Sequence, residues 1–188
     1  LDVTENQLDE PLAGKVALHI KRRIRRELQL TASAGVGPNK FIAKVASDIN
    51  KPDGIYIVPP DRVMAFVEGL PVEKLWSVGP ATASRLRALG LRTAGDVRRQ
   101  ELTRLQKLLG RQGAFIHRLS HGEDPRRVEP HREAKSRSAE TTFAIDAREA
   151  DVVEEALSRL VTRVSRALRK LGRPGRQVTL KIRYSDFT

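Results

Sequence analysis

Between residues 61 and 119 the chain is divided into short segments of helical character, and this division is the strongest limit on its fold. Glycine or proline lies between most of these segments, so they cannot merge into long helices. Short helices are stable only when they share an apolar core, which indicates an all-helical module. The sequence predicts its helices over residues 61–68, 72–75, 81–89, 94–98, 102–109 and 112–119.

The segments on either side of this module mix helix with strand. Before it we expect a basic amphipathic helix, a strand, a second helix and a second strand, at residues 13–28, 30–34, 39–49 and 55–58. After it we expect a strand near 138–143, a helix over 151–171 and a strand over 177–184, where apolar and polar residues alternate. The predicted fold class of the whole chain is therefore α+β.

Charge and composition restrict the function. Lys and Arg number 35 against 23 Asp and Glu, a formal net charge of +12, and the excess is spread along the chain. Such a balance favours a polyanionic partner, and the sequence has no apolar run of about 18 residues that would predict a membrane span. The hydrophobic content of 39% excludes full disorder. Cysteine is absent, which excludes disulfides and cysteine nucleophiles and fits a reducing compartment.

The run LWSVGPATASRLRALG, from Leu75 to Gly90, has the pattern of a helix-hairpin-helix. A short helix is followed by a tight Val-Gly-Pro turn and by a second helix that ends at glycine. We expect the backbone amides of Val78, Gly79 and Ala81 to be unpaired at the start of that helix, where the helix dipole favours an anion. These amides are predicted to bind a DNA backbone phosphate without reading base sequence. A plain helical hairpin, in which the glycine only permits the turn, also fits the pattern.

A second motif, GVGPNK at residues 35–40, joins a predicted strand to a predicted helix. Glycines in such a loop let a phosphate approach the backbone, and Lys40 could reach that phosphate as a point charge. The motif is not a Walker loop, because Phe and Ile follow the lysine where Ser or Thr would be needed. A structural turn explains the same residues equally well.

No metal site is predicted. His117 and His121 are four residues apart, with Glu123, Asp124 and His131 nearby. However, the expected helix ends near residue 119, and no third ligand has the dependable spacing of a zinc site. We therefore interpret the histidine pair as a solvated helix end.

Several motifs, taken in their order along the chain, resemble the Y-family DNA polymerases. They are LDVT at residues 1–4 ahead of a basic helix, TASAGVGPNKFIAKVASD at 31–48, KPDG at 51–54, LPV at 70–72, the helix-hairpin-helix, KSRS at 135–138 and ETTF at 140–143. The resemblance covers essentially the whole chain. Within the family it is strongest to the bacterial DNA polymerase IV branch of translesion enzymes.

The resemblance implies a division into domains and a role for several residues. It implies a partial palm with a β-α-β remnant, an all-helical thumb, a linker and the first half of an α/β little-finger domain, at residues 1–50, 51–124, 125–135 and 136–188. Lys40 would contact the triphosphate of the incoming nucleotide, and the hairpin would hold the DNA backbone across the minor groove. Arg137, Lys181 and Arg183 become candidate phosphate contacts of the little finger. The implied partners are primer-template DNA and a dNTP in the cytoplasm, with no membrane.

The resemblance also implies which parts of the enzyme lie elsewhere. The polymerase reaction uses carboxylates that bridge two Mg²⁺ ions. We expect those carboxylates ahead of Leu1, so no catalytic residue and no bound cofactor is predicted within the chain, and Asp2 is not one of them. The fingers, the second half of the little finger and the peptide that binds the sliding clamp are also expected outside it. The expected protein is therefore a DNA-binding fragment that extends no primer by itself.

Two other functions fit the sequence. A non-catalytic, DNA-binding accessory relative of these polymerases would share every motif, and the residues encoded ahead of Leu1 would separate the two. A ribosomal or RNA-binding protein would share the charge, but it would have to prefer RNA over DNA at matched salt, since phosphate attraction alone does not distinguish them.

Overall fold

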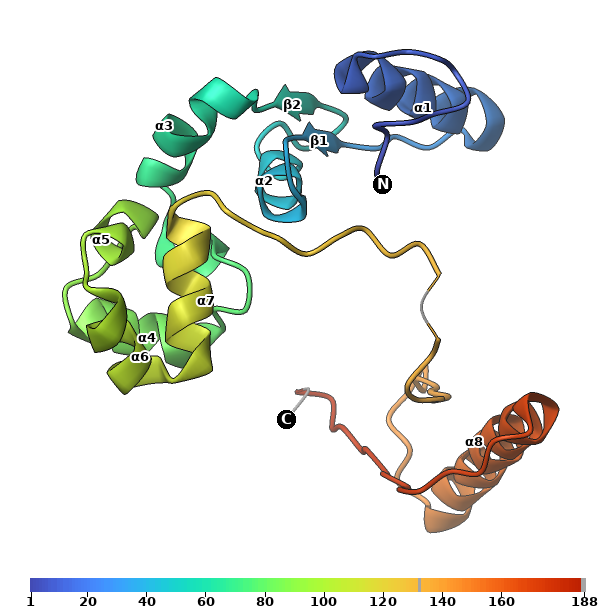
Figure 1. Cartoon of the computed structure of the whole chain (residues 1–188). Helices are drawn as coiled ribbons and strands as arrows, with labels where there is room; N and C mark the ends of the chain where they lie inside the picture. The colour runs from blue at the N-terminus through green and yellow to red at the C-terminus, as the bar shows by residue number, and fades with distance from the viewer. Residues whose placement is uncertain (132, 187–188) are drawn as a thin grey trace. The chain divides into compact units, whose positions relative to one another are not determined.

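A computed structural model describes residues 1–131 and 133–186 (Figure 1). The chain forms two compact units, Leu1–Pro130 and His131–Thr188. Among the described residues, the first unit holds a small sheet and a series of helices, and the second unit holds one long helix. No helix of the described part is long and apolar enough to cross a membrane.

The first unit opens with a β-α-β arrangement preceded by a helix. Helix α1 (Ala13–Leu28) leads to strand β1 (Ala34–Val36), helix α2 (Lys40–Ala46) and strand β2 (Ile55–Ile57). The two strands pair in parallel, and α2 forms the connection between them, so the predicted order is confirmed.

The sequence misplaces the first strand and the end of the second helix. The strand is predicted over residues 30–34, whereas β1 occupies 34–36 and includes Gly35. That glycine permits a close approach rather than a turn, because a Cβ on it would overlap the Ala43 carbonyl oxygen and the Ser47 amide. Helix α2 is predicted to run to residue 49 and instead ends at Ala46.

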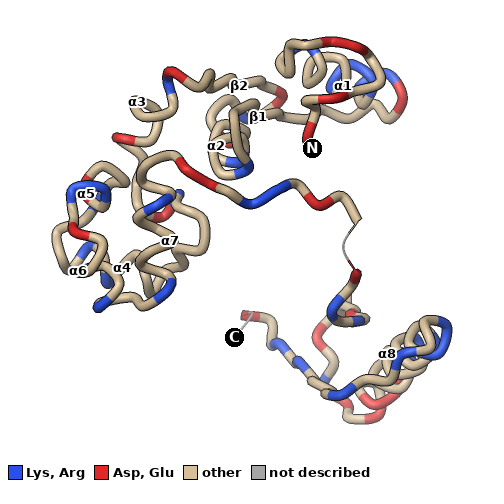
Figure 2. Tube along the Cα trace, viewed as in Figure 1, with Lys and Arg blue, Asp and Glu red and all other residues tan. Residues whose placement is uncertain are grey.

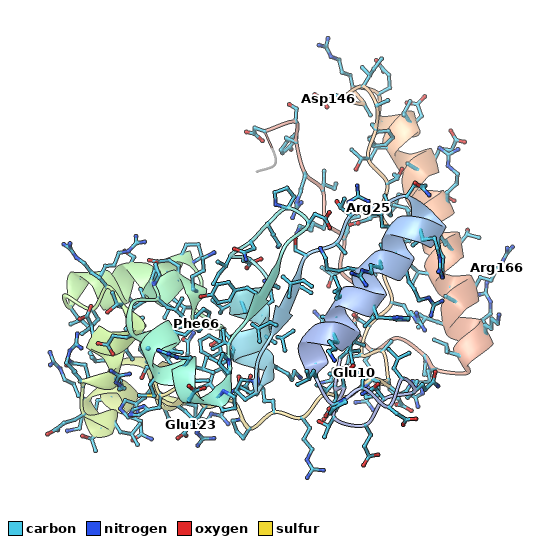
Figure 3. All side chains as sticks on the ribbon, turned by 90° about the horizontal axis from the view of Figure 1, so that it is seen from above. Glu10, Arg25, Phe66, Glu123, Asp146 and Arg166 are labelled. Carbon is cyan, nitrogen blue, oxygen red and sulfur yellow. The ribbon has the colours of Figure 1, made fainter. Side chains whose placement is uncertain are left out.

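Helix α1 is fixed to the sheet by a lysine near its middle. The Nζ of Lys21 donates to the carbonyl oxygens of Ala32 and Asp53 at 2.5 Å and lies 2.6 Å from Asp53 Oδ1. Arg25, labelled in Figure 3, donates to the other carboxylate oxygen of Asp53 at 3.0 Å. The hydrogen bond from Lys21 is the main reason that the pKa of Asp53 is below its ordinary value. The other arginines of α1 are exposed, and Figure 2 marks basic positions along the helix in blue.

The helical module follows the prediction closely. Its elements are η1 (Pro60–Arg62), α3 (Val63–Glu68), η2 (Val72–Lys74), α4 (Pro80–Ala88), α5 (Ala94–Arg98), α6 (Leu102–Leu109) and α7 (Arg111–Ser120). Thr93 and Asp96 form a capping box at the start of α5. Helices α6 and α7 approach each other closely at Gly113, where a Cβ would overlap the carbonyl oxygen of Leu105.

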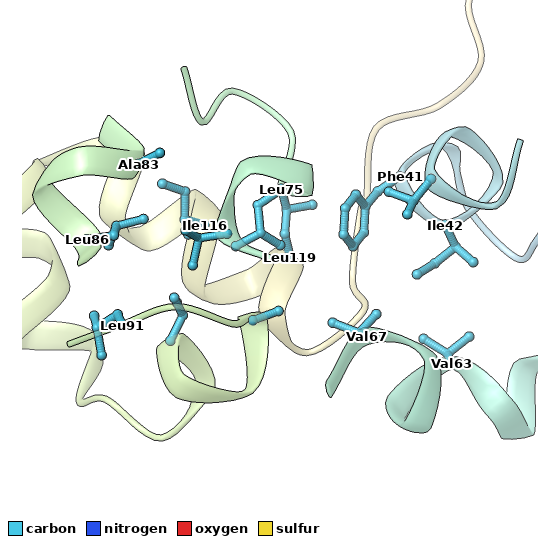
Figure 4. Close-up of a cluster of buried hydrophobic side chains, with 14 of the residues drawn as sticks. Phe41, Ile42, Val63, Val67, Leu75, Ala83, Leu86, Leu91, Ile116 and Leu119 are labelled. Atoms are coloured by element: carbon cyan, nitrogen blue, oxygen red, sulfur yellow. The ribbon is translucent and has the colours of Figure 1, made fainter. Parts of the chain in front are cut away.

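One apolar core runs through the first unit. Phe41 and Ile42 of α2 belong to the same buried cluster as Val67 of α3, Leu86 of α4 and Ile116 of α7 (Figure 4). All five side chains are fully buried. The strand pair and the helical module therefore share a core, and this sharing positions the loop before α2 next to the helices.

The second unit contains helix α8 (Ala150–Leu171), which ends at Gly172 in the left-handed conformation with φ 64°. The strands predicted near 138–143 and over 177–184 are wrong, because both segments are irregular and the described part of this unit contains no strand. A strand needs a neighbour to complete its hydrogen bonds, and neither segment has one among the described residues. The apolar residues of 177–184 are consequently exposed, with Val178 at 94%.

Candidate nucleic-acid interface

The turn between η2 and α4 is anchored to the core and to α7. Leu75 is buried, and Ser77 reverses the chain with a left-handed φ of 70°. Gln112 of α7 donates from its side-chain amide to the Ser77 carbonyl oxygen at 2.7 Å. The Val78 amide donates to the Leu75 carbonyl oxygen at 3.1 Å. The expectation that this amide is unpaired is therefore wrong, because the turn itself uses the donor.

The first turn of α4 presents backbone donors to solvent. Gly79 is its N-cap, without a side-chain cap, and Pro80 occupies the first helical position, where no amide is needed. Within the described residues, the amides of Gly79, Ala81 and Thr82 have no hydrogen-bond partner. Gly79 and Ala81 are exposed, and a Cβ on Gly79 would meet open space. This geometry can bind an anion such as a phosphate.

Thr82 is a residue that the sequence reasoning missed. A general rule could have identified it, because the first four backbone amides of every helix lack intrahelical partners. The proline removes one of these donors at Pro80, so the amides on either side of it and the one at Thr82 remain for a ligand.

An arginine lies against two aromatic rings, one of which belongs to the hairpin turn. The guanidinium carbon of Arg126 is 4.6 Å from the ring centre of Trp76 and 5.1 Å from that of Phe115. Arg126 also forms a bidentate pair with Asp124, with Nε–Oδ1 and Nη2–Oδ2 distances of 2.7 Å. The Asp124 side chain is fully buried, and the hydrogen bond from Arg126 lowers its pKa below the ordinary value.

The sequence gives little indication of this arrangement, because Arg126 lies in a polar, proline-containing segment that reads as an extended linker. Its ring contacts join the start of that segment to the residue that opens the hairpin turn. Trp76 is the only tryptophan of the chain and is 42% exposed. Its environment therefore reports on the hairpin.

Lys40 lies at the first position of α2, beside the chain that leaves α7. Its Nζ donates to the carbonyl oxygen of Arg127 at 3.0 Å. The preceding residue, Asn39, accepts from the Ile42 amide as the cap of α2 and donates from Nδ2 to the Gly122 carbonyl oxygen at 2.7 Å. The loop that contains the predicted triphosphate contact is thus bonded to the segment that follows the helical module.

Gly35 of β1 and Gly37 of the loop that follows it have a packing role. A Cβ on Gly35 would overlap the backbone of α2, and a Cβ on Gly37 would overlap the side chain of Ile42. Space at these positions is filled by α2, so close helix packing is sufficient to explain why both are glycine.

The cations predicted in the second unit are exposed. Arg137, Lys181 and Arg183 lie on irregular chain rather than on strands. No carboxylate among the described residues forms a salt bridge with any of them. Their charges are therefore available to a ligand, but no strand fixes their direction.

The described residues contain no group of three or more His, Asp or Glu side chains that could hold a metal ion. His117 and His121 contact each other, with ring centres 4.7 Å apart, and His121 Nδ1 lies 2.9 Å from the His117 carbonyl oxygen. Burial, and then the charge of His121, lower the pKa of His117 below its ordinary value of 6.5. Two imidazoles without a third ligand do not form a usual metal site.

Three family models match successive parts of the chain. The impB/mucB/samB family model matches residues 1–48, and the model of that family's C-terminal domain matches residues 134–188. Between them, residues 73–124 match the model described as "DNA polymerase-iota, thumb domain". This middle match contains the hairpin turn and helix α4.

Relatives and solved structures match over nearly the whole chain. DNA polymerase IV of Alkalilimnicola ehrlichii is 44% identical over 187 residues, which are 100% of this chain and 53% of the relative. DNA polymerase IV of Halorhodospira halophila is 46% identical over 187 residues, again 100% of this chain and 52% of the relative. A DinB family error prone DNA polymerase from Sulfolobus solfataricus has 26% identity and a TM-score of 0.63, over 88% of this chain and 50% of that chain.

The chain thus spans about half the length of the curated relatives that it matches. The family models follow the same order as the motifs of the sequence, and the open start of α4 lies in the part that matches a polymerase thumb. In its three successive parts the chain matches these family models, and it is similar to DNA polymerase IV over its whole length and to solved Y-family DNA polymerases over most of it.

Proposed function

We propose that the chain is the DNA-holding part of a translesion DNA polymerase. The whole enzyme transfers a nucleotide from a dNTP to the 3′-hydroxyl of a primer opposite a damaged template, in the cytoplasm. The observation that carries the proposal is the open start of α4, where the unpaired amides of Gly79, Ala81 and Thr82 lie in the part of the chain that matches a polymerase thumb.

The proposal gives each part of the chain a place in the polymerase. Residues 1–50 belong to the palm, 51–124 form the thumb, 125–135 the linker and 136–188 the first half of the little finger. The thumb binds the primer-template duplex through its backbone phosphates, so binding does not depend on base sequence. Arg137, Lys181 and Arg183 add phosphate contacts from the little finger.

Lys40 binds the triphosphate of the incoming dNTP in this proposal. Its ammonium already donates to the Arg127 carbonyl oxygen at 3.0 Å. An ammonium has three donors, so Lys40 can bind a phosphate oxygen while that hydrogen bond is kept. The hydrogen bond from Arg126 is the main reason that the pKa of Asp124 is lowered, and the charge of Lys40 contributes less. The pairing of Asp124 with Arg126 limits its competition with a phosphate for Lys40.

The polymerase reaction requires divalent metal, Mg²⁺ in our proposal, and the residues of this chain do not fit it. Two-metal catalysis needs several carboxylates on one pair of ions, and no group of three potential ligands occurs in the described part of the chain. We therefore place the metal-binding carboxylates, and the peptide for the sliding clamp, outside these residues. The chain alone binds primer-template DNA and extends no primer.

The test uses Trp76 as an internal reporter. Primer-template duplex is titrated into the full 188-residue chain while tryptophan emission is recorded, and an RNA duplex of the same length is used at the same salt. We expect a saturable change in Trp76 emission with the DNA and no preference for the RNA. A chain that prefers RNA, or one that binds DNA without any change at Trp76, contradicts the proposed role of the hairpin.

A primer-extension assay tests the second part of the proposal. The same chain is incubated with primer-template, the four dNTPs and Mg²⁺, beside an intact DNA polymerase IV as positive control. We expect no extended primer from the chain. Magnesium-dependent extension would show that the necessary carboxylates lie within it.

A further inference from the structure

Helix α8 carries a row of cations on one face. We define the basic stripe as Arg159, Arg163, Arg166 and Lys170, which are spaced by four, three and four residues and therefore lie along one side of the helix. These residues, with Thr162 and Ala167, line a shallow hollow on the surface of the helix. Figure 3 shows Arg166 pointing away from the ribbon, and Figure 2 shows the basic end of α8.

Local pairing does not account for the stripe. Arg159 pairs with Glu155 at 3.1 Å, and both side chains are more than two-thirds exposed. Among the described residues, Arg163, Arg166 and Lys170 have no salt-bridge partner. Like charges three and four residues apart on a helix repel each other and destabilise it. The stripe is therefore unfavourable for the isolated helix.

The helix dipole accounts for only one end of it. A cation in the last turn of a helix is stabilised by the dipole, and Lys170 lies there. Arg163 and Arg166 precede the last turn, where this effect has faded. Neither local pairing nor the helix dipole therefore accounts for the clustering of Arg163 and Arg166.

The shape and chemistry of the stripe fit a phosphate backbone better than an acidic protein. The row spans about 16 Å at 1.5 Å per residue, which is about five steps of one nucleic-acid strand at 3.4 Å per step. Guanidinium groups match phosphate with two parallel hydrogen bonds. Thr162 and Ala167 are small, so a flat backbone can reach the cations. A protein interface would need large apolar side chains at its centre, and the hollow is lined by none.

We propose that the basic stripe of α8 is a second binding surface for the phosphate backbone of nucleic acid, separate from the hairpin. The stripe contains no aromatic side chain on which a base could stack. It therefore binds single-stranded and duplex nucleic acid without reading sequence. The proposal does not depend on the role of the hairpin, because its residues lie in the second compact unit.

The experiment compares two double variants of the full chain that remove the same charge. Arg163→Gln with Arg166→Gln removes two cations from the stripe. The matched control, Arg148→Gln with Arg176→Gln, removes two exposed cations of the same unit that lie outside α8. Circular dichroism checks that α8 is retained in both.

The readout is the salt dependence of affinity for fluorescein-labelled duplex, measured by anisotropy. Each lost phosphate contact reduces the slope of log K against log salt by about 0.9, so we expect the stripe variant to lose about 1.8 and the control far less. The change in Trp76 emission at saturation should be unaltered in both, which separates the stripe from the hairpin. Equal slopes in the two variants would overturn the proposal, because affinity would then depend only on the net charge of the chain and not on the position of the cations.

A competitor identifies the class of partner. Polyglutamate and single-stranded DNA of equal charge are each titrated against the labelled duplex bound to the unmodified chain. We expect the single strand to compete through the stripe and the stripe variant to lose that competition. The proposal is wrong if polyglutamate competes as well as the single strand and loses that competition in the stripe variant. An acidic protein surface would then be the partner.

Discussion

The open space at Gly79 permits a substitution that tests the hairpin and leaves the fold intact. Gly79 has φ −87° and ψ 177°, an extended conformation that valine adopts readily, and a Cβ there would contact nothing within 4 Å. We therefore expect Gly79→Val to remain folded, with a loss of stability of about 1 kcal/mol because valine is a poorer N-cap than glycine. Its methyl groups, however, occupy the position from which a phosphate would reach the amides of Gly79 and Ala81.

The size of the effect follows from the kind of bond that is lost. A hydrogen bond to a charged group contributes about 1.5–3 kcal/mol. The loss of one such bond to a phosphate corresponds to about 10- to 100-fold weaker DNA binding. The amides carry no net charge, so they neutralise no phosphate and release no counterion. The slope of affinity against salt should therefore stay the same, and the whole line should shift to weaker binding.

The assay is fluorescence anisotropy with labelled primer-template between about 50 and 200 mM salt, a range in which phosphate contacts have large effects. Gly69→Val is the matched control, since Gly69 has φ −89° and its Cβ would also meet open space, but it lies at the end of α3. Tight binding by Gly79→Val in a folded protein would refute the role of the amides. Equal weakening by Gly69→Val would show that the effect is not local to the hairpin.

Three further predictions concern stability. Arg126→Ala removes both guanidinium hydrogen bonds to the buried carboxylate of Asp124, which keeps only the backbone amide of residue 126 as a donor. The free energy of unfolding in urea should fall by about 2 kcal/mol; a loss confined to pH values below the ordinary pKa of Asp124 would contradict this. Gly113→Ala should lower the free energy of unfolding by about 1–3 kcal/mol because the new methyl group overlaps the Leu105 backbone. An unchanged urea midpoint would mean that α6 and α7 can move apart without loss of stability. The lowered pKa of His117 means that the unfolded chain binds a proton at this residue more readily than the folded chain does. The free energy of unfolding should therefore be highest, as far as this residue is concerned, above pH 6.5 and fall as the pH drops below it. His117→Gln should flatten this part of the pH profile.

The helices were predictable because their signals are local. Helices α1, α5 and α6 have the predicted bounds, α7 is longer than predicted by one residue at each end, and α8 is longer by one residue at its start. Amphipathic spacing and the capping box at Thr93 specify these elements without help from distant residues. The strands behave differently, since β1 depends on its pairing with β2 and on close packing of Gly35 against α2. Pairing of that kind cannot be read from one segment alone.

Some features of the candidate site could likewise be predicted from local sequence, and others could not. The amides of Gly79 and Ala81 could be predicted from the Val-Gly-Pro turn, but the use of the Val78 amide within the turn depends on where the Leu75 carbonyl oxygen lies. The contact between Arg126 and Trp76 joins residues that are far apart in the sequence. No local pattern indicates it, because it results from the fold of the whole first unit.

The hydrogen bonds of Asn39 and Lys40 affect the length of the free connection between the two units. The resemblance sets the start of the linker at residue 125, but the backbone at Gly122 and Arg127 is already tied to the loop before α2. The connection to the second unit therefore starts later than the sequence indicates, and each residue removed from it shortens its reach by about 3.5 Å. If both units bind DNA as proposed, a shorter connection that still spans the two sites raises the effective concentration of the second unit at a DNA molecule already bound by the first.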